Sequence, residues 1–397
     1  MTTQEYILLR APGRKANTLL GAVRGGEALG DVEIEVDARK LTPKEVRDAR
    51  QDPSTLHAAP VMEVKLARPF EAHEGAQATD LKNATWGLNA VGAVDSPFTG
   101  AGVVAAVLDT GIAAGHAAFR GKELIQQDFT GEGDGDQNGH GTHCAGTFFG
   151  GEVGGLRIGV APGVQRALIG KVLDARGRGS TRQILDGVLW AVQNGANVIS
   201  MSIGLDFPGV VARLVASGYE VEPATSIALS AYRENVRLFD TLAGLVRAHS
   251  AMFSKAILIG AAGNESRRPN YTIATAPPAA ADGFVSVGAL GQGPDGRLTI
   301  ASFSNSGPTV AGPGVAIKSA AHDQPEGLRS LNGTSMATPH VAGIAALWLE
   351  RITAQNPKAH ISQLEARLIG SCASDLLAVA GEELNDAGAG LVRAPTA

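Results

Sequence analysis

The stretch GVVAAVLDTGI, residues 102–112, joins an unbroken apolar run to Asp109, Thr110 and Gly111. A continuous apolar run that ends at a turn signal suits a parallel strand covered on both faces of its sheet. The sequence therefore predicts buried parallel strands, one of which ends at a carboxylate. Similar apolar runs occur at 166–175, 197–204, 255–264 and 283–290.

Helical patterns separate these apolar runs. Residues 180–195, STRQILDGVLWAVQNG, carry apolar residues at helical spacing between a capping Ser180 and a terminating Gly195. Residues 335–357 form a second helical pattern that is mostly apolar, so this helix is expected to be central. Alternating strands and helices predict an α/β fold with a doubly wound, mainly parallel sheet, whose functional site lies at the carboxyl ends of its strands.

The first 70 residues do not show this alternation of strands and helices. Thr42 followed by Pro43 predicts the start of a short helix, because threonine is a good N-cap and proline is tolerated at the first helical position. The composition of residues 1–70 and the order of the predicted elements indicate a small α+β domain. Its strands are expected at 5–11, 32–41 and 59–69.

A polar stretch of small residues separates this domain from the rest. Residues 71–85 show no apolar periodicity, which is typical of a linker. The alternation of strands and helices begins after Trp86. The predicted organisation is a small domain at 1–70, a linker at 71–85 and a main domain at 86–397.

The composition excludes several classes of protein. The chain has 397 residues, 44% of them hydrophobic, which is ample for a full core. A net charge of -5 argues against nucleic acid as the main partner, and no apolar run is long enough for a membrane span. The first residues, MTTQEYILLRAPGRK, lack the pattern of a signal peptide. We therefore expect a cytoplasmic location, with Cys144 and Cys372 both reduced.

Three side chains of complementary chemistry lie near element boundaries. Asp109 follows a strand, and Ser335 stands where a loop turns into the apolar helix. His140 lies in the glycine-rich stretch QNGHGTHCAG, residues 137–146. A serine needs a base to become a nucleophile, and the base needs a third group that fixes its tautomer. Taken singly, each of the three residues can also be a turn former or a helix cap.

The histidine stretch has a second interpretation. His140 and His143 are three positions apart, so they share a helix face and could hold a metal ion together. Alternatively, one is a catalytic base and the other packs inside. The stretch alone leaves the choice open, although Gly141 and Thr142 supply no glutamate beside the first histidine, as HExxH metal sites do.

Five motifs carry more information together than any residue does alone. They are VLDTGI at 107–112, GHGTHCAGT at 139–147, SMSIG at 200–204, AAGNES at 261–266 and GTSMATPHVAG at 333–343. With these motifs in the family's order, the chain strongly resembles the subtilisin-like serine proteases, or subtilases, from about Trp86 to near its end. The resemblance implies a subtilisin-like catalytic domain that acts as a serine endopeptidase through an acyl-enzyme.

The resemblance also implies a role for each residue of the site. Ser335 would be the nucleophile, His140 the base and Asp109 the group that orients the base. The oxyanion would be held by the Asn264 side chain and the Ser335 backbone N–H. His143 falls on a position that packs inside, which favours the catalytic interpretation over a metal pair.

A bound substrate is implied to add an extended strand to the enzyme. The small, mostly uncharged pocket walls suit an apolar or medium-sized residue before the cut, while Glu265 at the rim could favour a basic one. The implied substrate-binding residues are Gly177 and Gly179 on one edge, Ser202, Ile203 and Gly204 on the other, and Ala261, Ala262 and Gly263 beside the pocket.

The N-terminal domain resembles in size and position the inhibitory propeptide of this family. The linker would pass through the active site and be cut around Gly75–Lys82, so the chain is expected to be a self-inhibited zymogen. Its partners would then be a protein or peptide substrate and its own N-terminal domain as an intramolecular inhibitor. The alternative is a permanent docking domain that is never removed.

No cofactor is required for this chemistry, and the metal content stays open. Structural calcium is frequent in the family, and carboxylate and amide oxygens are its preferred ligands. A solvated acidic turn explains the same residues, so calcium is possible but unassigned. The oxygen donors near His140 are Asp128, Asp134, Asp136 and Asn138.

An extra segment distinguishes the chain from compact bacterial members of the family. Residues 205–226 precede a helix predicted at 227–250 and lie next to the predicted substrate cleft. The segment could shape specificity, contact a partner, or be a plain surface elaboration.

Two other functions fit part of the pattern. A degenerate subtilase homologue would bind peptides or partners without cleaving them, although the triad residues and Asn264 are all present. An esterase or amidase on an α/β-hydrolase scaffold would need GxSxG around its serine, whereas Ser335 lies in GTSMA. The order Asp, His, Ser also differs from the order in that scaffold.

Overall fold

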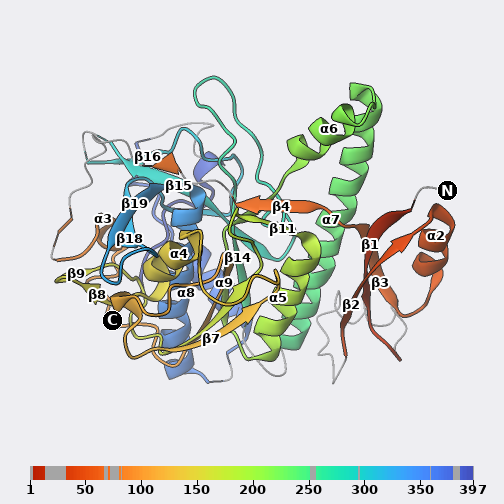
Figure 1. Cartoon of the computed structure of the whole chain (residues 1–397). Coiled ribbons are helices and arrows are strands. Elements are labelled where there is room, and N and C mark those ends of the chain that lie inside the picture. The colour runs from red at the N-terminus through yellow and green to blue at the C-terminus, as the bar shows by residue number, and fades with distance from the viewer. Residues whose placement is uncertain are drawn as a thin grey trace.

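The computed structural model (Figure 1) describes residues 3–13, 33–66, 70–71, 80–81, 83–250, 256–293, 296–357, 359–378 and 385–396. Its centre is a sheet with the strand order β16-β15-β14-β12-β6-β10-β7, and β17 also pairs with β15. All of these pairs are parallel except β15 with β16. The strands are β6 (Val104–Asp109), β7 (Glu123–Asp128), β10 (Arg166–Lys171), β12 (Val198–Met201), β14 (Ile257–Ala261), β15 (Phe284–Gln292), β16 (Leu298–Ile300) and β17 (Val310–Pro313).

Helices cover both faces of this sheet, which explains the unbroken apolar runs. In β6, Ala105 and Val107 join the core on one face, while Ala106 and Leu108 join the core on the other. The first core includes α4 (His140–Phe149), α8 (Thr334–Gln355) and α9 (Ile361–Gly370). The second includes α5 (Thr181–Gln193) and α7 (Val221–Ser250). The predicted doubly wound, mainly parallel sheet is confirmed.

The strand–helix order brings the predicted site residues to one edge of the sheet. Asp109 is the last residue of β6, and Ala261 is the last residue of β14. Ser202 follows β12 and precedes the short strand β13 (Ile203–Leu205). Because the strands are parallel, their carboxyl ends meet at the same edge.

Several short elements complete the main domain. They are α3 (Trp86–Ala90), the 3₁₀-helix η1 (Ala117–Phe119), β8 (Glu152–Val153), β9 (Leu156–Arg157), β11 (Arg178–Ser180), β18 (Ile317–Ala320) and β19 (Leu328–Asn332). Within the described part of the chain, no helix combines the length and apolar composition that a membrane span requires.

The N-terminal unit, defined here as residues 3–13 and 33–60, is a three-stranded antiparallel sheet with one helix. Its strand order is β2-β1-β3. Thr42 and Glu45 form a capping box, in which each side chain accepts a hydrogen bond from the other residue's backbone N–H. The helix begins where the sequence predicted. The elements are β1 (Gln4–Arg10), β2 (Glu35–Leu41), α2 (Pro43–Gln51) and β3 (Thr55–Pro60).

The strand predicted at 59–69 is two strands that belong to different sheets. The first is the end of β3, and the second is β4 (Glu63–Leu66), which leaves the N-terminal unit and pairs with the main domain. Part of the predicted linker is also paired, because β5 (Phe70–Glu71) lies antiparallel to β19. The predicted cut around Gly75–Lys82 lies, except for Asp80 and Leu81, outside the described residues.

The extra segment is a helical hairpin. The sequence predicted a helix only from residue 227, whereas α6 spans Phe207–Ala216 and α7 begins at Val221. Asp206 caps α6 by accepting a hydrogen bond from the Gly209 N–H. No residue of α6 is fully buried, because the helix packs on α7 at the surface. The local signals that could have found it are the capping Asp206 and Pro208 in the first turn.

Helix α7 connects the main domain to the N-terminal unit (Figure 1). The Asn235 side chain donates a hydrogen bond to the Pro60 carbonyl at 2.9 Å, and His57 Nε2 lies 3.0 Å from the Glu234 carbonyl. Arg50 forms an ion pair with the Glu234 carboxylate at 3.3 Å. The helix therefore serves as a platform on which β3 rests.

This platform makes docking of the N-terminal unit depend on pH. Burial lowers the pKa of His57 below its ordinary 6.5, and Arg50 and Arg237 lower it further, while Glu234 raises it. A docked His57 thus takes up a proton less readily than an undocked one. We therefore expect His57 to contribute fully to docking above the ordinary pKa of 6.5 and to weaken docking as the pH falls below it.

We expect hydrogen exchange in β1, β2 and β3, corrected for its intrinsic pH dependence, to be faster at about pH 5 than at about pH 7.5. His57→Gln keeps a donor for the Glu234 carbonyl but cannot be protonated. This variant should lose most of the pH dependence. An undiminished pH dependence in His57→Gln would contradict the explanation.

Candidate active site

Asp109 is a buried carboxylate at the end of β6. Its side chain is 1% exposed, and it accepts a hydrogen bond from the Thr110 N–H at 2.8 Å. The second partner is His140, whose Nδ1 lies 2.8 Å from Oδ1 and 3.0 Å from Oδ2 of Asp109. A buried carboxylate is stable only when hydrogen-bond donors surround it, so the burial of Asp109 strongly favours its hydrogen bond with His140.

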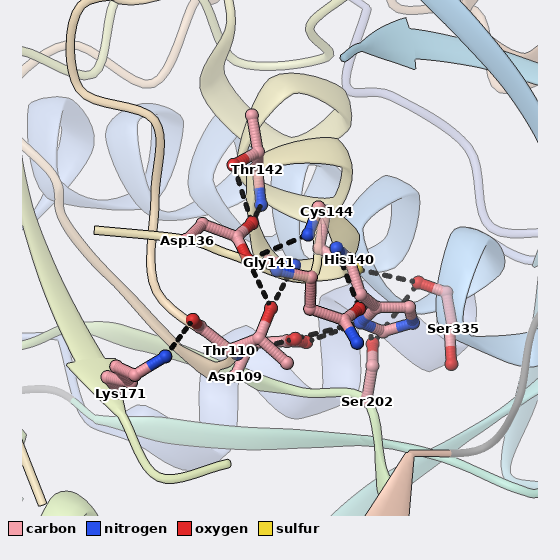
Figure 2. Close-up of polar contacts among 12 residues, drawn as sticks. Asp109, Thr110, Asp136, His140, Gly141, Thr142, Cys144, Lys171, Ser202 and Ser335 are labelled. Carbon is pink, nitrogen blue, oxygen red and sulfur yellow. Dashed lines mark hydrogen bonds and ion pairs between the residues drawn. The ribbon is translucent and has the colours of Figure 1, made fainter. Parts of the chain in front are cut away.

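A hydrogen-bond network fixes the start of α4 against the end of β6 (Figure 2). Asp136 accepts hydrogen bonds from the Thr110 hydroxyl at 2.9 Å and the Thr142 hydroxyl at 2.6 Å. The Gly141 N–H donates to the Thr110 hydroxyl at 3.0 Å. A Cβ at Gly141 would lie 2.2 Å from the Gly111 carbonyl oxygen, so only glycine permits this approach.

The environment of His140 favours its protonated form. Burial by itself lowers the pKa of the imidazole, but the Asp109 carboxylate opposes this effect and raises the pKa of His140 well above 6.5. The Nδ1 contact with Asp109 also selects the tautomer in which Nδ1 carries a proton. The neutral ring therefore presents Nε2 as a base, and Nε2 has no hydrogen-bond partner among the described residues.

Ser335 lies beside this pair, in the first turn of α8 (Figure 2). Its carbonyl accepts hydrogen bonds from Ser202 Oγ at 3.1 Å and Cys144 Sγ at 3.4 Å. Cys144 Sγ is also 3.8 Å from His140 Nδ1, so the thiol lies between the histidine and the serine. The three residues predicted as a triad are thus brought together from β6, α4 and α8.

Asn264 approaches the same helix start. Its Oδ1 accepts hydrogen bonds from the Thr334 N–H at 2.9 Å and the Thr334 hydroxyl at 2.8 Å. Two donors on one atom fix the orientation of the amide. The Nδ2 end then faces Gly333, where an added Cβ would lie 3.2 Å away. Sequence reasoning identified Asn264 but missed Thr334, which orients it from the position before Ser335.

The other two histidines of the motifs are internal. His143 Nε2 donates to the carbonyls of Ile317 and Arg329 at 2.9 and 3.1 Å, and burial lowers its pKa to about 3. His340 is buried in α8, and burial lowers its pKa to about 4. His140 and His143 use their ring nitrogens for separate purposes, so the geometry does not favour a metal pair.

The predicted substrate-binding edges are the two sides of a three-stranded sheet whose middle strand is β4. The order is β11-β4-β13, with both pairs antiparallel. On one side Gly179 is opposite Val64, and the Leu66 N–H donates to the Gly177 carbonyl at 3.0 Å. On the other side the register pairs Ile203 with Leu66 and Gly204 with Lys65.

The remaining predicted residues lie next to Ser335 and Asn264. Ser202 directs its hydroxyl to the Ser335 carbonyl. The Gly263 N–H donates to the Thr334 hydroxyl at 3.2 Å, and the Ala262 carbonyl accepts from Asn305 at 3.1 Å. The segment Ala261–Gly263 is therefore held against the start of α8 by side chains that the sequence did not single out.

Two of the predicted oxygen donors near His140, Asp128 and Asp136, accept hydrogen bonds from nearby backbone and hydroxyl groups. Asp128 accepts hydrogen bonds from the Thr130 and Gly133 backbone N–H groups at 2.7 and 2.8 Å. Asp136 is engaged by Thr110 and Thr142, as described above. These bonds explain why acidic residues occur in this turn.

His140, His143 and His340 should titrate with different pKa values. We expect His140 to show a pKa above 6.5, because Asp109 stabilises its charged form. His143 and His340 should stay neutral down to about pH 5, because both are buried and no described carboxylate pairs with either ring. Histidine-selective ¹H–¹⁵N NMR measures all three. In Asp109→Asn the His140 value should fall, and an unchanged value would contradict this account.

Comparisons with known proteins agree with this arrangement. The family model described as the subtilase family matches residues 100–389. An alkaline serine exoprotease A from Vibrio alginolyticus is 33% identical over 360 residues, covering 86% of this chain and 56% of the relative. An extracellular serine proteinase from a Thermus species is 32% identical over 351 residues, covering 85% of this chain and 70% of the relative. The chain thus spans little more than half the length of the Vibrio relative.

Two solved structures resemble the fold. Fervidolysin from Fervidobacterium pennivorans superimposes with a TM-score of 0.68 at 19% identity, covering 99% of this chain and 60% of that chain. This similarity concerns the fold alone. A cold adapted subtilisin-like serine proteinase has a TM-score of 0.56 at 28% identity and covers 80% of this chain and 100% of that chain.

The relatives correct one expectation from the sequence. The cytoplasmic location is contradicted, because relatives are named as an exoprotease, an extracellular serine proteinase and a cuticle-degrading serine protease. The expectation rested only on the first fifteen or so residues. An export signal is a targeting segment separate from the folded domain, so the folded part of a protein does not reveal it. With a matching family model, relatives at about one-third identity and the assembled site, we conclude that the chain belongs to the subtilase family.

Proposed function

We propose that the chain is a serine endopeptidase that hydrolyses peptide bonds through Asp109, His140 and Ser335. One observation carries the proposal. An extended strand, β4, lies between the facing edges of β11 and β13, which we call the groove, and pairs with both of them. Ser202, just before β13, donates a hydrogen bond to the Ser335 carbonyl, so the groove lies next to Ser335. A peptide substrate bound by strand addition would have the same form.

In the proposed mechanism, His140 Nε2 removes the proton from Ser335 Oγ as the oxygen attacks the peptide carbonyl. Asp109 holds the ring in the required tautomer and stabilises the imidazolium that forms. His140 then gives the proton to the leaving amine, and water hydrolyses the acyl-enzyme by the reverse sequence. All of these steps use side chains of the chain itself, without a cofactor.

The negative charge that develops on the carbonyl oxygen needs donors that are already oriented. We assign this role to Asn264 and the Ser335 backbone N–H. The support is the double hydrogen bond from Thr334, which fixes the amide plane of Asn264 before any substrate arrives. A preorganised donor costs no reorientation at the moment of reaction.

We further propose that the N-terminal part of the chain inhibits the enzyme until it is cut. The support is that β4 occupies the groove that a substrate strand would need. Leu66 pairs with the groove edge, whereas Phe70 pairs with Asn332 of β19, three positions before Ser335. Both pairings lie with segments next to Ser335 in the sequence or in contact with it, so we propose a cut between Leu66 and Phe70, upstream of the 75–82 region expected from sequence.

The first test is the intact mass of the purified chain, with and without a fluorophosphonate. We expect a fragment that has lost its N-terminus between Leu66 and Phe70 and that carries one adduct. Ser335→Ala should remove both the adduct and the cut, because the same hydroxyl performs both reactions. An unlabelled chain with no activity on casein would support the alternative, a homologue that binds peptides without cleaving them.

The second test concerns the oxyanion donors. Asn264→Ala should lower kcat about 10²–10³-fold with a small effect on KM, which is the size of effect seen on removing this kind of donor in a member of the family. Thr334→Val should cause a smaller loss, because the amide would remain but be less firmly oriented. Steady-state kinetics on one peptide substrate measures both, and an unchanged kcat in Asn264→Ala would refute the assignment.

A further inference from the structure

The side chains of β4 alternate between a buried and a half-exposed side. Val64 and Leu66 are buried, at 0% and 6% exposure. Glu63 and Lys65 point the other way, with side chains 33% and 34% exposed. Successive residues of a strand face opposite sides, so any chain bound in this register presents every second side chain on the outer face.

The outer face of β4 meets the start of α6. Lys65 Nζ donates to Asp206 Oδ1 at 2.6 Å. Arg213, less than two turns along α6, lies 3.0 Å from the Glu63 carboxylate and 3.7 Å from Asp206. The charges therefore alternate: an acid of the main domain faces the lysine, and a base faces the glutamate two positions before it.

Asp206 is a fixed part of the groove rather than of the strand inside it. It directly follows β13, one of the two groove edges, and its carboxylate caps α6 at Gly209. Its side chain is only 15% exposed. Burial raises the pKa of Asp206, but Lys65, the Gly209 N–H and Arg213 together lower it by more, so the net pKa is below the ordinary value.

We propose that Asp206 and Arg213 form a specificity pair that reads two alternate side chains of a bound substrate. Asp206 would select lysine or arginine at the position opposite Gly204, and Arg213 would favour a carboxylate two residues before it. This inference rests on the proposed endopeptidase function. It gives the helical hairpin a direct role in substrate selection. β4 of the same chain occupies this pair before any substrate binds.

The size of the effect follows from the exposure of the partners. Asp206 is mostly buried, so we expect about a three- to tenfold preference in kcat/KM for lysine over glutamine opposite Gly204. Arg213 is 50% exposed, so the preference for glutamate over glutamine at the earlier position should be weaker, at most about threefold. High salt should reduce the second preference more than the first.

The test uses competing peptides in one reaction with the full-length protein. One peptide contains the core Glu-Val-Lys-Leu-Ala, which repeats residues 63–67 of the chain, and the other has glutamine in place of the lysine. The ratio of their cleavage rates at low concentration is the ratio of kcat/KM. This ratio does not depend on how much enzyme is active, so differences in self-inhibition between variants cancel.

Asp206→Asn should bring the ratio to within about twofold of one, and Asp206→Lys should reverse it for a peptide with glutamate at that position. Glu222→Gln, which removes an exposed acid from the first turn of α7, is the matched control and should keep the original ratio. Cleavage with a ratio that Asp206→Asn leaves unchanged would overturn the inference while leaving the endopeptidase function intact. Cleavage of neither peptide would refute the function itself, and this inference with it.

Discussion

The site depends on a buried carboxylate that must be surrounded by donors. Asp109 is 1% exposed, and removing a charge from water costs several kcal/mol unless hydrogen bonds replace the lost hydration. The donors come from the next residue and from His140, 31 positions later in the chain. The end of β6 and the start of α4 must therefore lie in contact, and Gly141 is the residue whose lack of a side chain allows it.

The same contact accounts for other features of the site. Once α4 is fixed against β6, Cys144 lies one turn further along and reaches the carbonyl of Ser335. The start of α8 is then held from three directions, by Cys144, by Ser202 and, through Thr334, by Asn264. Each of these groups comes from a different strand end or helix start. Preorganisation here is a property of the sheet edge as a whole rather than of any single side chain.

The sequence predicted what depends on local pattern. Apolar runs indicated the parallel strands, and Thr42 and Ser180 marked helix starts that the structure has in capping boxes. It missed what depends on register between distant segments. The pairing of Lys65 with Asp206 joins residues 141 apart, and neither residue is unusual in its own neighbourhood. Helix α6 was a different kind of miss, because Asp206 and Pro208 signal its start locally and the prediction nevertheless began the helix only at residue 227.

The occupied groove also explains why the connection between the two parts of the chain is not a simple linker. β3 rests on α7, β4 fills the groove, and β5 pairs with β19, so consecutive short segments each bind a different part of the main domain. Segments joined in one chain bind at high effective concentration, and each holds the next in place. A break between Leu66 and Phe70 would separate β5 from β4 and leave the N-terminal unit held by α7, by α5 and by β4 in the groove. Release would then depend on contacts that are partly polar and partly titratable, at His57 and at Asp206, which lie on the helical hairpin or face it.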